Sequence, residues 1–388
     1  MKRWTCLLNL ILGSLILVIL LTVGGASAVE PVKIGLLAPL TGFAAADGLS
    51  VQNSVTLAVE RVLTEGGILN RPVQLVVYDD RADAKEAVAL ARKLIQQDRV
   101  IAAVGGSYST PTRAVAPIFN DAEVPFVAAY AVHPDITRAG DYVFRNGFLG
   151  MVEGKSAAHV AVEMLDAKRI ALLTSDNDFG RTLAEGFKTY MNKKGGEAEI
   201  VFEQTYPFQE KDFKPYLSKI KEVDPDLIFA SGYYFQTGPI VKQAREMGID
   251  AKILGEEGAD SPKFLEIAGD AAEGFVIVTN LDRDDPRPVV QNFLKEYQER
   301  YEIQPDMVGA SAYDAFMIIV DAVNRAGATE GPKVQEAIAN TKQYNGLTGV
   351  LKGFTDIGEV VKEVQVQIVK DGAFRHFGKV TDMELITP

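Results

Sequence analysis

The sequence of 388 residues is poor in the side chains that form disulfides and zinc sites. It has one cysteine, Cys6, and one tryptophan, Trp4, and both lie within the first 28 residues. Beyond that segment no intramolecular disulfide can form. The three histidines, His133, His159 and His376, are far apart and none belongs to an H-E-x-x-H motif. We therefore expect neither a scaffold stabilised by disulfides nor a zinc centre built from Cys and His.

Catalytic and nucleotide-binding motifs are also missing. No P-loop is present, and no G-x-G-x-x-G follows the first expected strand. Residues 105–109 read G-G-S-Y-S, which differs from the G-x-S-x-G motif of a catalytic serine. The formal net charge is −12, whereas proteins that bind nucleic acid usually carry a basic surface. We expect no enzymatic activity, no cofactor and no nucleic-acid partner. A hydrolase would need a nucleophile–base pair and a sensor would need an output domain, and the sequence shows neither.

The N-terminus has the pattern of a targeting segment. Lys2 and Arg3 precede an apolar run over residues 7–23, and Ala26-Ser27-Ala28 matches an A-x-A cleavage signal. We expect residues 1–28 to be a signal peptide that is removed on export. An uncleaved membrane anchor is the alternative, because the run is close to the lower length limit of about 17 residues for a spanning helix.

The following chain alternates short apolar strands with amphipathic helices. Expected strands cover residues 32–37, 73–78, 100–104 and 125–129, and the helices between them include 51–63 and 84–97. The alternation starts again near residue 142, with strands at 169–174, 199–203, 227–230, 252–254 and 275–279 and helices at 153–165, 182–193, 213–221, 239–247 and 262–268. This order predicts two α/β modules with doubly wound parallel sheets.

After Asp282 the pattern changes. Helices are expected at 289–301, 307–326 and 333–339, and strands at 349–352 and 364–370. A chain of this length exceeds the roughly 250–300 residues that one core accommodates. The late helices suggest that the chain returns to the first module, which predicts a hinge and a cleft between two lobes.

One stretch, residues 100–117, combines a buried strand with a hydroxyl-rich turn. Gly105 and Gly106 are followed by Ser109, Thr110 and Pro111, which favour the start of a helix. The free N–H groups and positive dipole of a helix start can bind a small carboxylate. The simpler alternative is that Ser109 or Thr110 only caps the helix.

Two pairs of adjacent acids stand out. Asp79-Asp80 closes a strand, and its members should point to opposite faces, so we interpret the pair as a solvated feature at the start of a helix. Glu256-Glu257 follows another strand. Taken alone, Glu257 is interpreted as a solvated turn residue.

Several ordered motifs are similar to those of a known family. They are Pro39-Leu40-Thr41-Gly42, Glu65-Gly66-Gly67-Ile68, Tyr78-Asp79-Asp80, Gly232-Tyr233, Gly255-Glu256-Glu257-Gly258 and Ala272-Glu273-Gly274. As a set they resemble the periplasmic binding proteins of branched-chain amino acid ABC transporters, over nearly the whole chain after residue 28. The resemblance implies an α/β fold of two doubly wound parallel-sheet lobes joined by a three-segment hinge. It places the N-terminal lobe at 29–146 plus 280–354 and the C-terminal lobe at 147–279 plus 355–388.

The resemblance also implies a ligand site between the lobes. Ser109 matches the serine that binds the ligand α-carboxylate, and the loop Tyr130-Ala131-Val132 matches a second carboxylate contact. Val132 stands where the family has a hydroxyl residue, so only backbone groups of Tyr130 or Ala131 could serve there. Glu257 and Tyr233 match the residues that bind the α-ammonium.

Two departures affect the side-chain pocket. Phe179 replaces a family tyrosine, which keeps a ring and loses a hydroxyl. Residues 42–47 lack the family's pocket aromatic, for which Phe43 is a candidate replacement. We expect a monomeric periplasmic receptor that delivers a branched-chain or similar apolar amino acid to an inner-membrane permease. The alternative ligand on the same fold is an amide, an aromatic carboxylate or another small organic acid.

Overall fold

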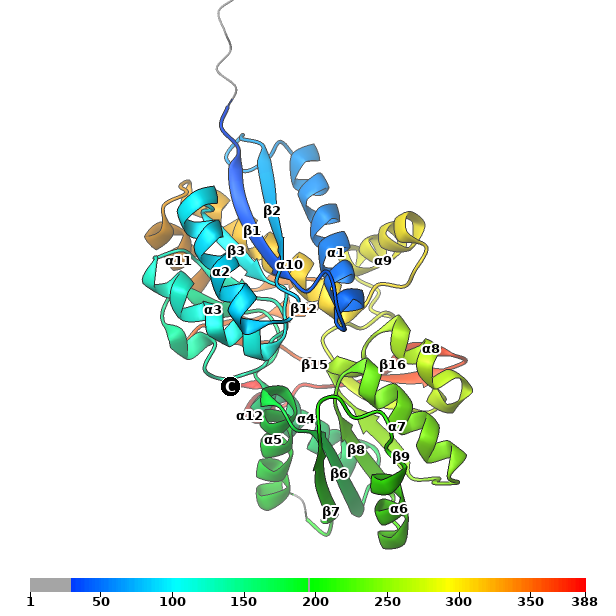
Figure 1. Cartoon of the computed structure of the whole chain (residues 1–388). Coiled ribbons are helices and arrows are strands. Elements are labelled where there is room, and N and C mark those ends of the chain that lie inside the picture. Colours follow the sequence, from blue (N-terminus) through cyan, green and yellow to red (C-terminus); the bar gives the residue numbers. More distant parts are fainter. Residues whose placement is uncertain (1–28, 195) are drawn as a thin grey trace, which may run out of the picture.

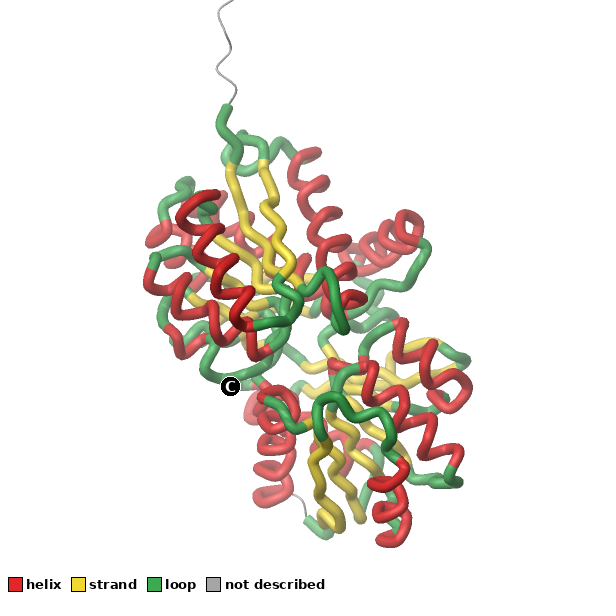
Figure 2. The backbone as a smooth tube through the Cα atoms, viewed as in Figure 1, coloured by secondary structure: helices red, strands yellow, loops and turns green. Residues whose placement is uncertain are grey.

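The computed structural model describes residues 29–194 and 196–388, so the predicted signal peptide lies outside the described residues. These residues form two lobes, each built on a sheet with helices on both faces (Figures 1 and 2). The first lobe is the body built on the five-stranded sheet, and the second lobe is the body built on the seven-stranded sheet. The predicted α/β fold with two doubly wound lobes is confirmed.

The sheet of the first lobe is entirely parallel, in the order β2-β1-β3-β4-β5. Its strands are β1 (Val32–Ala38), β2 (Val73–Asp79), β3 (Ala102–Gly105), β4 (Phe126–Ala128) and β5 (Val143–Arg145). Its helices are α1 (Ala45–Thr64), α2 (Ala84–Lys93, extended by a π-helical turn at Leu94–Asp98) and α3 (Ser109–Asp121), joined by α9 (Pro288–Tyr301), α10 (Met307–Ala326) and α11 (Gly331–Ala339) from late in the chain. Because α10 packs on α1 and on β3, the predicted return of the chain to the first module is observed.

The sheet of the second lobe has the order β16-β15-β10-β9-β8-β6-β7. Its parallel strands are β6 (Arg169–Ser175), β7 (Glu199–Tyr206), β8 (Leu227–Ser231), β9 (Lys252–Gly255) and β10 (Val276–Thr279), and the antiparallel hairpin β15 (Val364–Lys370) and β16 (Ala373–Val380) extends it at β10. Its helices are α4 (Gly150–His159, continued by a π-helical segment Val160–Met164), α5 (Asp178–Lys194), α6 (Lys214–Val223), α7 (Tyr234–Glu246), α8 (Pro262–Ala268) and α12 (Met383–Ile386). Short 3-10 turns lie at Thr137–Ala139, Glu257–Ala259 and Gly269–Ala272.

The central strands are buried on both faces, as their continuous apolar runs predict. Every residue of β3, β8 and β10 is buried. Within the described part of the chain, α10 is the one helix that is long and apolar enough to cross a membrane, and 83% of that stretch is buried inside the protein. Since α10 packs between α1, α11 and the first sheet, its apolar character is that of a core helix.

Several features differ from the sequence prediction, among them the start of α1 at Ala45 rather than residue 51. Helix α7 begins at Tyr234 rather than Pro239, because Gln236 Oε1 accepts a hydrogen bond of 3.1 Å from the N–H of Tyr233 and fixes the helix start upstream of the proline. Strand β16 lies in the segment after residue 370, which was expected to be β-like but for which no strand bounds were predicted. The two small sheets β11 (Tyr344–Gly346) with β12 (Gly349–Leu351), and β13 (Gly353–Phe354) with β14 (Val360–Val361), were predicted only in part.

The chain passes from the first sheet to the second after β5, returns after β10, and crosses again between β14 and β15. A buried ion pair joins two of these crossings: Arg145 Nε lies 2.8 Å from Glu359 Oε2, and both side chains are at most 1% exposed. The lobe boundaries given above stay a prediction.

Candidate functional site

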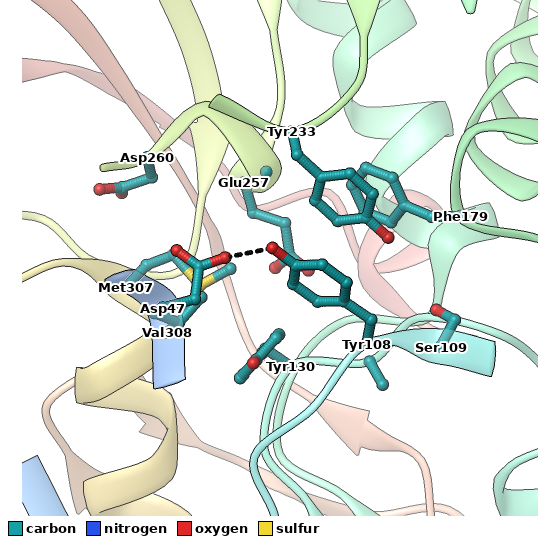
Figure 3. A pocket seen from close by; sticks show the side chains of 12 residues that line it. Asp47, Tyr108, Ser109, Tyr130, Phe179, Tyr233, Glu257, Asp260, Met307 and Val308 are labelled. Atoms are coloured by element: carbon teal, nitrogen blue, oxygen red, sulfur yellow. Dashed lines mark hydrogen bonds between the residues drawn. The ribbon is translucent and has the colours of Figure 1, made fainter. Parts of the chain in front are cut away.

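A pocket lies between the lobes, where the carboxyl ends of strands from both sheets face each other (Figure 3). Loops after parallel strands are the usual place for a ligand in such folds. The lining residues are Asp47, Tyr108, Ser109, Tyr130, Ala131, Phe179, Tyr233, Glu257, Gly258, Asp260, Met307 and Val308. Six of the seven residues predicted for the site are therefore brought together, and Val132 is not among the lining residues.

Ser109 is the first residue of α3, directly after the β3 turn. The capping alternative is wrong, because Tyr108 occupies the N-cap position and no side chain caps the helix. Instead, the Ser109 hydroxyl accepts a hydrogen bond of 3.2 Å from the N–H of Val132. The first-turn N–H groups of Ser109 and Thr110 have no intrahelical acceptor, as at any helix start. Donors and the positive dipole end thus meet at this wall of the pocket.

The loop after β4 adds further donors. Among the described residues no hydrogen bond takes up the N–H of Tyr130 or of Ala131, although both residues are at least 96% buried. The carbonyl of Ala131 accepts from the guanidinium of Arg145, and the Tyr130 hydroxyl donates to the Gly106 carbonyl at 2.8 Å. Val132 is fully buried behind the wall with its N–H bound to Ser109. What this loop offers the pocket is therefore the backbone N–H groups of Tyr130 and Ala131.

Glu257 lies on the opposite wall, after β9. It is 2% exposed, so the solvated-turn alternative is wrong. Its Oε2 accepts a hydrogen bond of 2.7 Å from Asn280, and its own N–H donates to Glu153 Oε1 at 2.9 Å. Burial, and then the nearby Glu153 and Glu256, raise the pKa of Glu257 well above its usual value. A cation in the pocket would restore its charge.

The neighbouring Glu256 has a structural role. Its carboxylate accepts from the N–H groups of Gly232 and Gly258, both at 2.7 Å, and its side chain is fully buried. It thereby fixes the turn that carries Tyr233 to the turn that carries Glu257.

Aromatic rings fill the centre of the pocket. The ring of Tyr108, from the first lobe, stacks on that of Tyr233 with centroids 4.3 Å apart, and Tyr233 stacks on Phe179 at 4.8 Å. The ring centroid of Phe43 lies 5.9 Å from that of Tyr108, but Phe43 is not among the residues that line the pocket. The cavity among the side chains is about 20 Å³, room for about one water molecule. A ligand of amino-acid size therefore requires the two walls to separate.

Sequence reasoning missed several lining residues, above all Asp47 and Tyr108. Asp47 lies in the first turn of α1, and its Oδ2 accepts a hydrogen bond of 2.6 Å from the Tyr108 hydroxyl. Burial and the nearby Asp306 raise the pKa of Asp47 to about 8. Asp260 was also missed, and its carboxylate is occupied by Thr279 and by the guanidinium of Arg283. The only sequence signal for Asp47 was its place in the segment 42–47.

The other acidic pair also behaves differently from the prediction. Asp80 is 1% exposed and accepts from the Ser107 hydroxyl at 3.1 Å and from the Ala82 N–H at 2.9 Å. Burial raises the pKa of Asp80 to about 6. The interpretation as a solvated pair is therefore wrong for Asp80, which anchors the β3 turn.

In residues 29–194 and 196–388, no group of three His, Cys, Asp or Glu side chains is arranged to hold a metal ion.

Comparison with known proteins gives a consistent result. The family model described as "Periplasmic binding protein" matches residues 31–373. A "Leucine-, isoleucine-, valine-, threonine-, and alanine-binding protein" of Pseudomonas aeruginosa is 30% identical over 339 residues, which cover 86% of this chain and 88% of that protein.

Two solved structures show the same fold. One is a branched-chain amino acid transporter substrate-binding protein of Streptococcus pneumoniae in complex with isoleucine, with 29% identity and a TM-score of 0.84 over 90% of this chain and 99% of the other. The second is an ABC transporter solute-binding protein of Rhodopseudomonas palustris in complex with 3,4-dihydroxybenzoic acid, with 25% identity and a TM-score of 0.82 over 90% and 97%. These relatives are binding proteins of transporters, which implies a role other than catalysis. The chain belongs to the periplasmic binding protein family and is a substrate-binding protein of the ABC transporter type.

Proposed function

We propose that this protein binds an α-amino acid, of the branched-chain or a similar apolar class, between its lobes and delivers it to a permease in the inner membrane. The observation that carries the proposal is the chemistry of the two opposed walls. One wall presents the buried carboxyl group of Glu257, and the other presents the Ser109 hydroxyl and free backbone N–H groups. An α-amino acid carries the complementary pair of charges on neighbouring atoms.

The ammonium end is the more demanding half of the ligand. Taking an ammonium out of water costs several kcal/mol unless a carboxylate and further acceptors receive it. In the proposed complex the ammonium gives Glu257 its missing partner, and the Tyr233 hydroxyl lies on the same wall as a further acceptor (Figure 3). Each buried ion then satisfies the other.

The carboxylate end is received without a cation. Ser109, the N-terminus of α3 and the N–H groups of Tyr130 and Ala131 converge on the first-lobe wall. Backbone N–H groups at a helix start stabilise a carboxylate through hydrogen bonds and the helix dipole.

Apolar side chains on both sides of the pocket give its apolar character. Phe179 stacks on the Tyr233 ring in the second lobe, and Met307 and Val308 of α10 offer hydrocarbon surface from the first lobe. The names of the relatives, which include binding of leucine, isoleucine and valine, support the same class of ligand.

The alternative ligand is an aromatic carboxylate. The stacked rings of Tyr108, Tyr233 and Phe179 would suit a flat ligand, and one structural relative binds 3,4-dihydroxybenzoic acid. An acid without an amine, however, would leave the carboxyl group of Glu257 buried without a cation, which favours the amino acid.

The proposed event is closure of the two lobes around the ligand, which the permease would detect in a monomeric receptor of the periplasm. A thermal-shift screen of amino acids, amides and aromatic acids tests the ligand class. A ligand at 100 times its dissociation constant stabilises the folded chain by about 2.7 kcal/mol. We expect amino acids to raise the melting temperature. A shift with amine-free carboxylates and none with amino acids would contradict the proposal.

A further inference from the structure

The pocket contains a second carboxylate that an α-amino acid group does not satisfy. Asp47 comes from α1 in the first lobe, lines the pocket and is 4% exposed. Its Oδ2 accepts the Tyr108 hydroxyl at 2.6 Å (Figure 3), and within the described residues no hydrogen bond reaches its Oδ1. The side chain therefore presents at the pocket wall a polar oxygen without a hydrogen-bond partner.

The charged groups around Asp47 do not neutralise it. Asp306, just before α10, uses its carboxylate to accept from Ser50 and from the Gly309 N–H. Asp260, after β9, is paired with Arg283. None of the pocket-lining residues is Lys, Arg or His. Asp47 thus faces two other acids and a tyrosine, and no cation of the pocket is available to it.

The free energy of burying Asp47 in the complex depends on the side chain of the ligand. Burying a polar atom without a hydrogen-bond partner costs about 1–3 kcal/mol. An aliphatic side chain pressed against Asp47 would incur that cost, because it would exclude water and offer no donor. A hydroxyl, amide or ammonium group of the ligand would remove it.

We propose that Asp47 selects the side chain of the ligand and favours α-amino acids whose side chain ends in a hydrogen-bond donor over aliphatic amino acids of the same shape. This inference rests on the proposed function, in which Glu257 and Ser109 hold the α-amino and α-carboxylate groups. It keeps the α-amino acid of the proposed function but departs from the apolar side chain proposed there, in favour of a side chain with a hydroxyl, an amide or an ammonium group.

A purely local role of Asp47 is the competing explanation. Its hydrogen bond to Tyr108 could serve only to orient that ring against Tyr233. The two roles predict different effects of the Tyr108→Phe substitution. If Asp47 only orients the ring, Tyr108→Phe and Asp47→Ala should change the affinity for all ligands in the same way. If Asp47 contacts the ligand, Tyr108→Phe frees the carboxylate and keeps the donor preference.

The test is calorimetric binding of three ligand pairs. Valine and threonine match in shape, as do leucine and asparagine, and lysine extends norleucine by one atom, the ammonium nitrogen. The wild-type protein is expected to bind the donor member of at least one pair at least tenfold more tightly. Asp47→Ala should abolish that ratio, and Tyr108→Phe should preserve it. Asp47→Asn keeps the size of the side chain and an acceptor oxygen but loses the negative charge, so it should abolish a preference for lysine and keep a preference for threonine or asparagine. Asp47→Leu, which has a similar size and no polar atom, replaces Asp47→Ala should that variant not fold.

Proton release separates an ammonium from a neutral donor. Because the pKa of Asp47 is raised to about 8, its carboxyl group is largely protonated at neutral pH before a cation binds. If an ammonium is the partner, lysine should release about one more proton than norleucine, measured as the dependence of the heat on buffer ionisation enthalpy. If lysine and norleucine release equal numbers of protons, and threonine or asparagine binds more tightly than its aliphatic partner, the group that Asp47 recognises is a neutral donor.

The experiments distinguish failure of the proposed function from failure of this inference. If the wild-type protein binds no α-amino acid of any pair, the proposed function fails and the inference with it. If it binds amino acids but prefers the aliphatic member of every pair, or if Asp47→Ala leaves the ratios unchanged, only the inference is overturned. A parallel change of all affinities in Asp47→Ala and Tyr108→Phe also overturns it.

Discussion

The substitution Glu257→Gln tests the ammonium site most directly. Glutamine keeps the size of the side chain and an oxygen that can accept the 2.7 Å hydrogen bond from Asn280, so the local fold should be retained. What is lost is the negative charge opposite the ligand ammonium. Removing one member of a buried, hydrogen-bonded charge pair costs about 2–5 kcal/mol. Because the amide oxygen still accepts a hydrogen bond, we expect the lower part of this range, about 2–3 kcal/mol, or about 30- to 150-fold weaker binding.

Isothermal calorimetry is the suitable assay, since the sequence has one tryptophan, Trp4, in the predicted signal peptide, and binding cannot rely on tryptophan fluorescence. The matched control is Glu203→Gln, which makes the same change of charge in the second lobe. Glu203 is 45% exposed at the side chain and pairs with Lys188 on the surface, so its substitution should leave affinity within about twofold. Equal affinity of Glu257→Gln and the wild-type protein for their tightest amino acid would refute the assignment of Glu257.

Three further predictions concern the site and the hinge. Ser109→Ala should weaken amino-acid binding at least tenfold in calorimetry, because it removes a donor from the carboxylate wall; unchanged affinity would argue against that role. Burial raises the pKa of Glu153 to about 8, so the folded chain holds a proton there that the unfolded chain loses above pH 4.5. Stability of the ligand-free protein should then fall as pH rises from about 5 to 8, by up to ~1.4 kcal/mol per pH unit for each such group, and Glu153→Gln should flatten this slope in thermal melts. Arg145→Met should lower the free energy of unfolding by about 3–5 kcal/mol in urea titrations, since it leaves Glu359 buried without its partner, whereas Lys188→Met breaks an exposed pair and should cost less than about 1 kcal/mol.

Much of the fold could be predicted because it follows from local patterns. Short β-branched runs that alternate with amphipathic segments specify βα units, and the apolar length of 307–326 specifies a core helix. Among the site residues, Ser109 was indicated by the glycine turn and the helix start that follow a buried strand. The roles of Tyr233 and Glu257 came from the resemblance of their motifs to the family. All three lie in loops after parallel strands, whose carboxyl ends lie at one edge of a sheet.

Asp47 and Tyr108 could not be found in this way. Residues 45–48 read Ala-Ala-Asp-Gly, which has no helical periodicity, so the helix was expected to begin at residue 51 and Asp47 to lie in a turn. Its burial depends on Tyr108, which is 61 residues away, and on Asp306 from the late helices. The burial of Glu256 likewise depends on the Gly232 N–H from another loop. Such long-range partners leave no local pattern in the sequence.

The geometry of Arg145 explains how ligand binding and lobe closure can be coupled. Arg145 ends β5 at the first crossing between the lobes, and its guanidinium is fixed by Glu359 near the third crossing. The same guanidinium donates to the carbonyls of Ala131 and His133. The loop that presents its N–H groups to the proposed ligand carboxylate is therefore bonded to the hinge itself. We therefore expect a rotation of the lobes that shifts Arg145 to shift this loop as well, and closure to depend on the geometry of the proposed carboxylate wall.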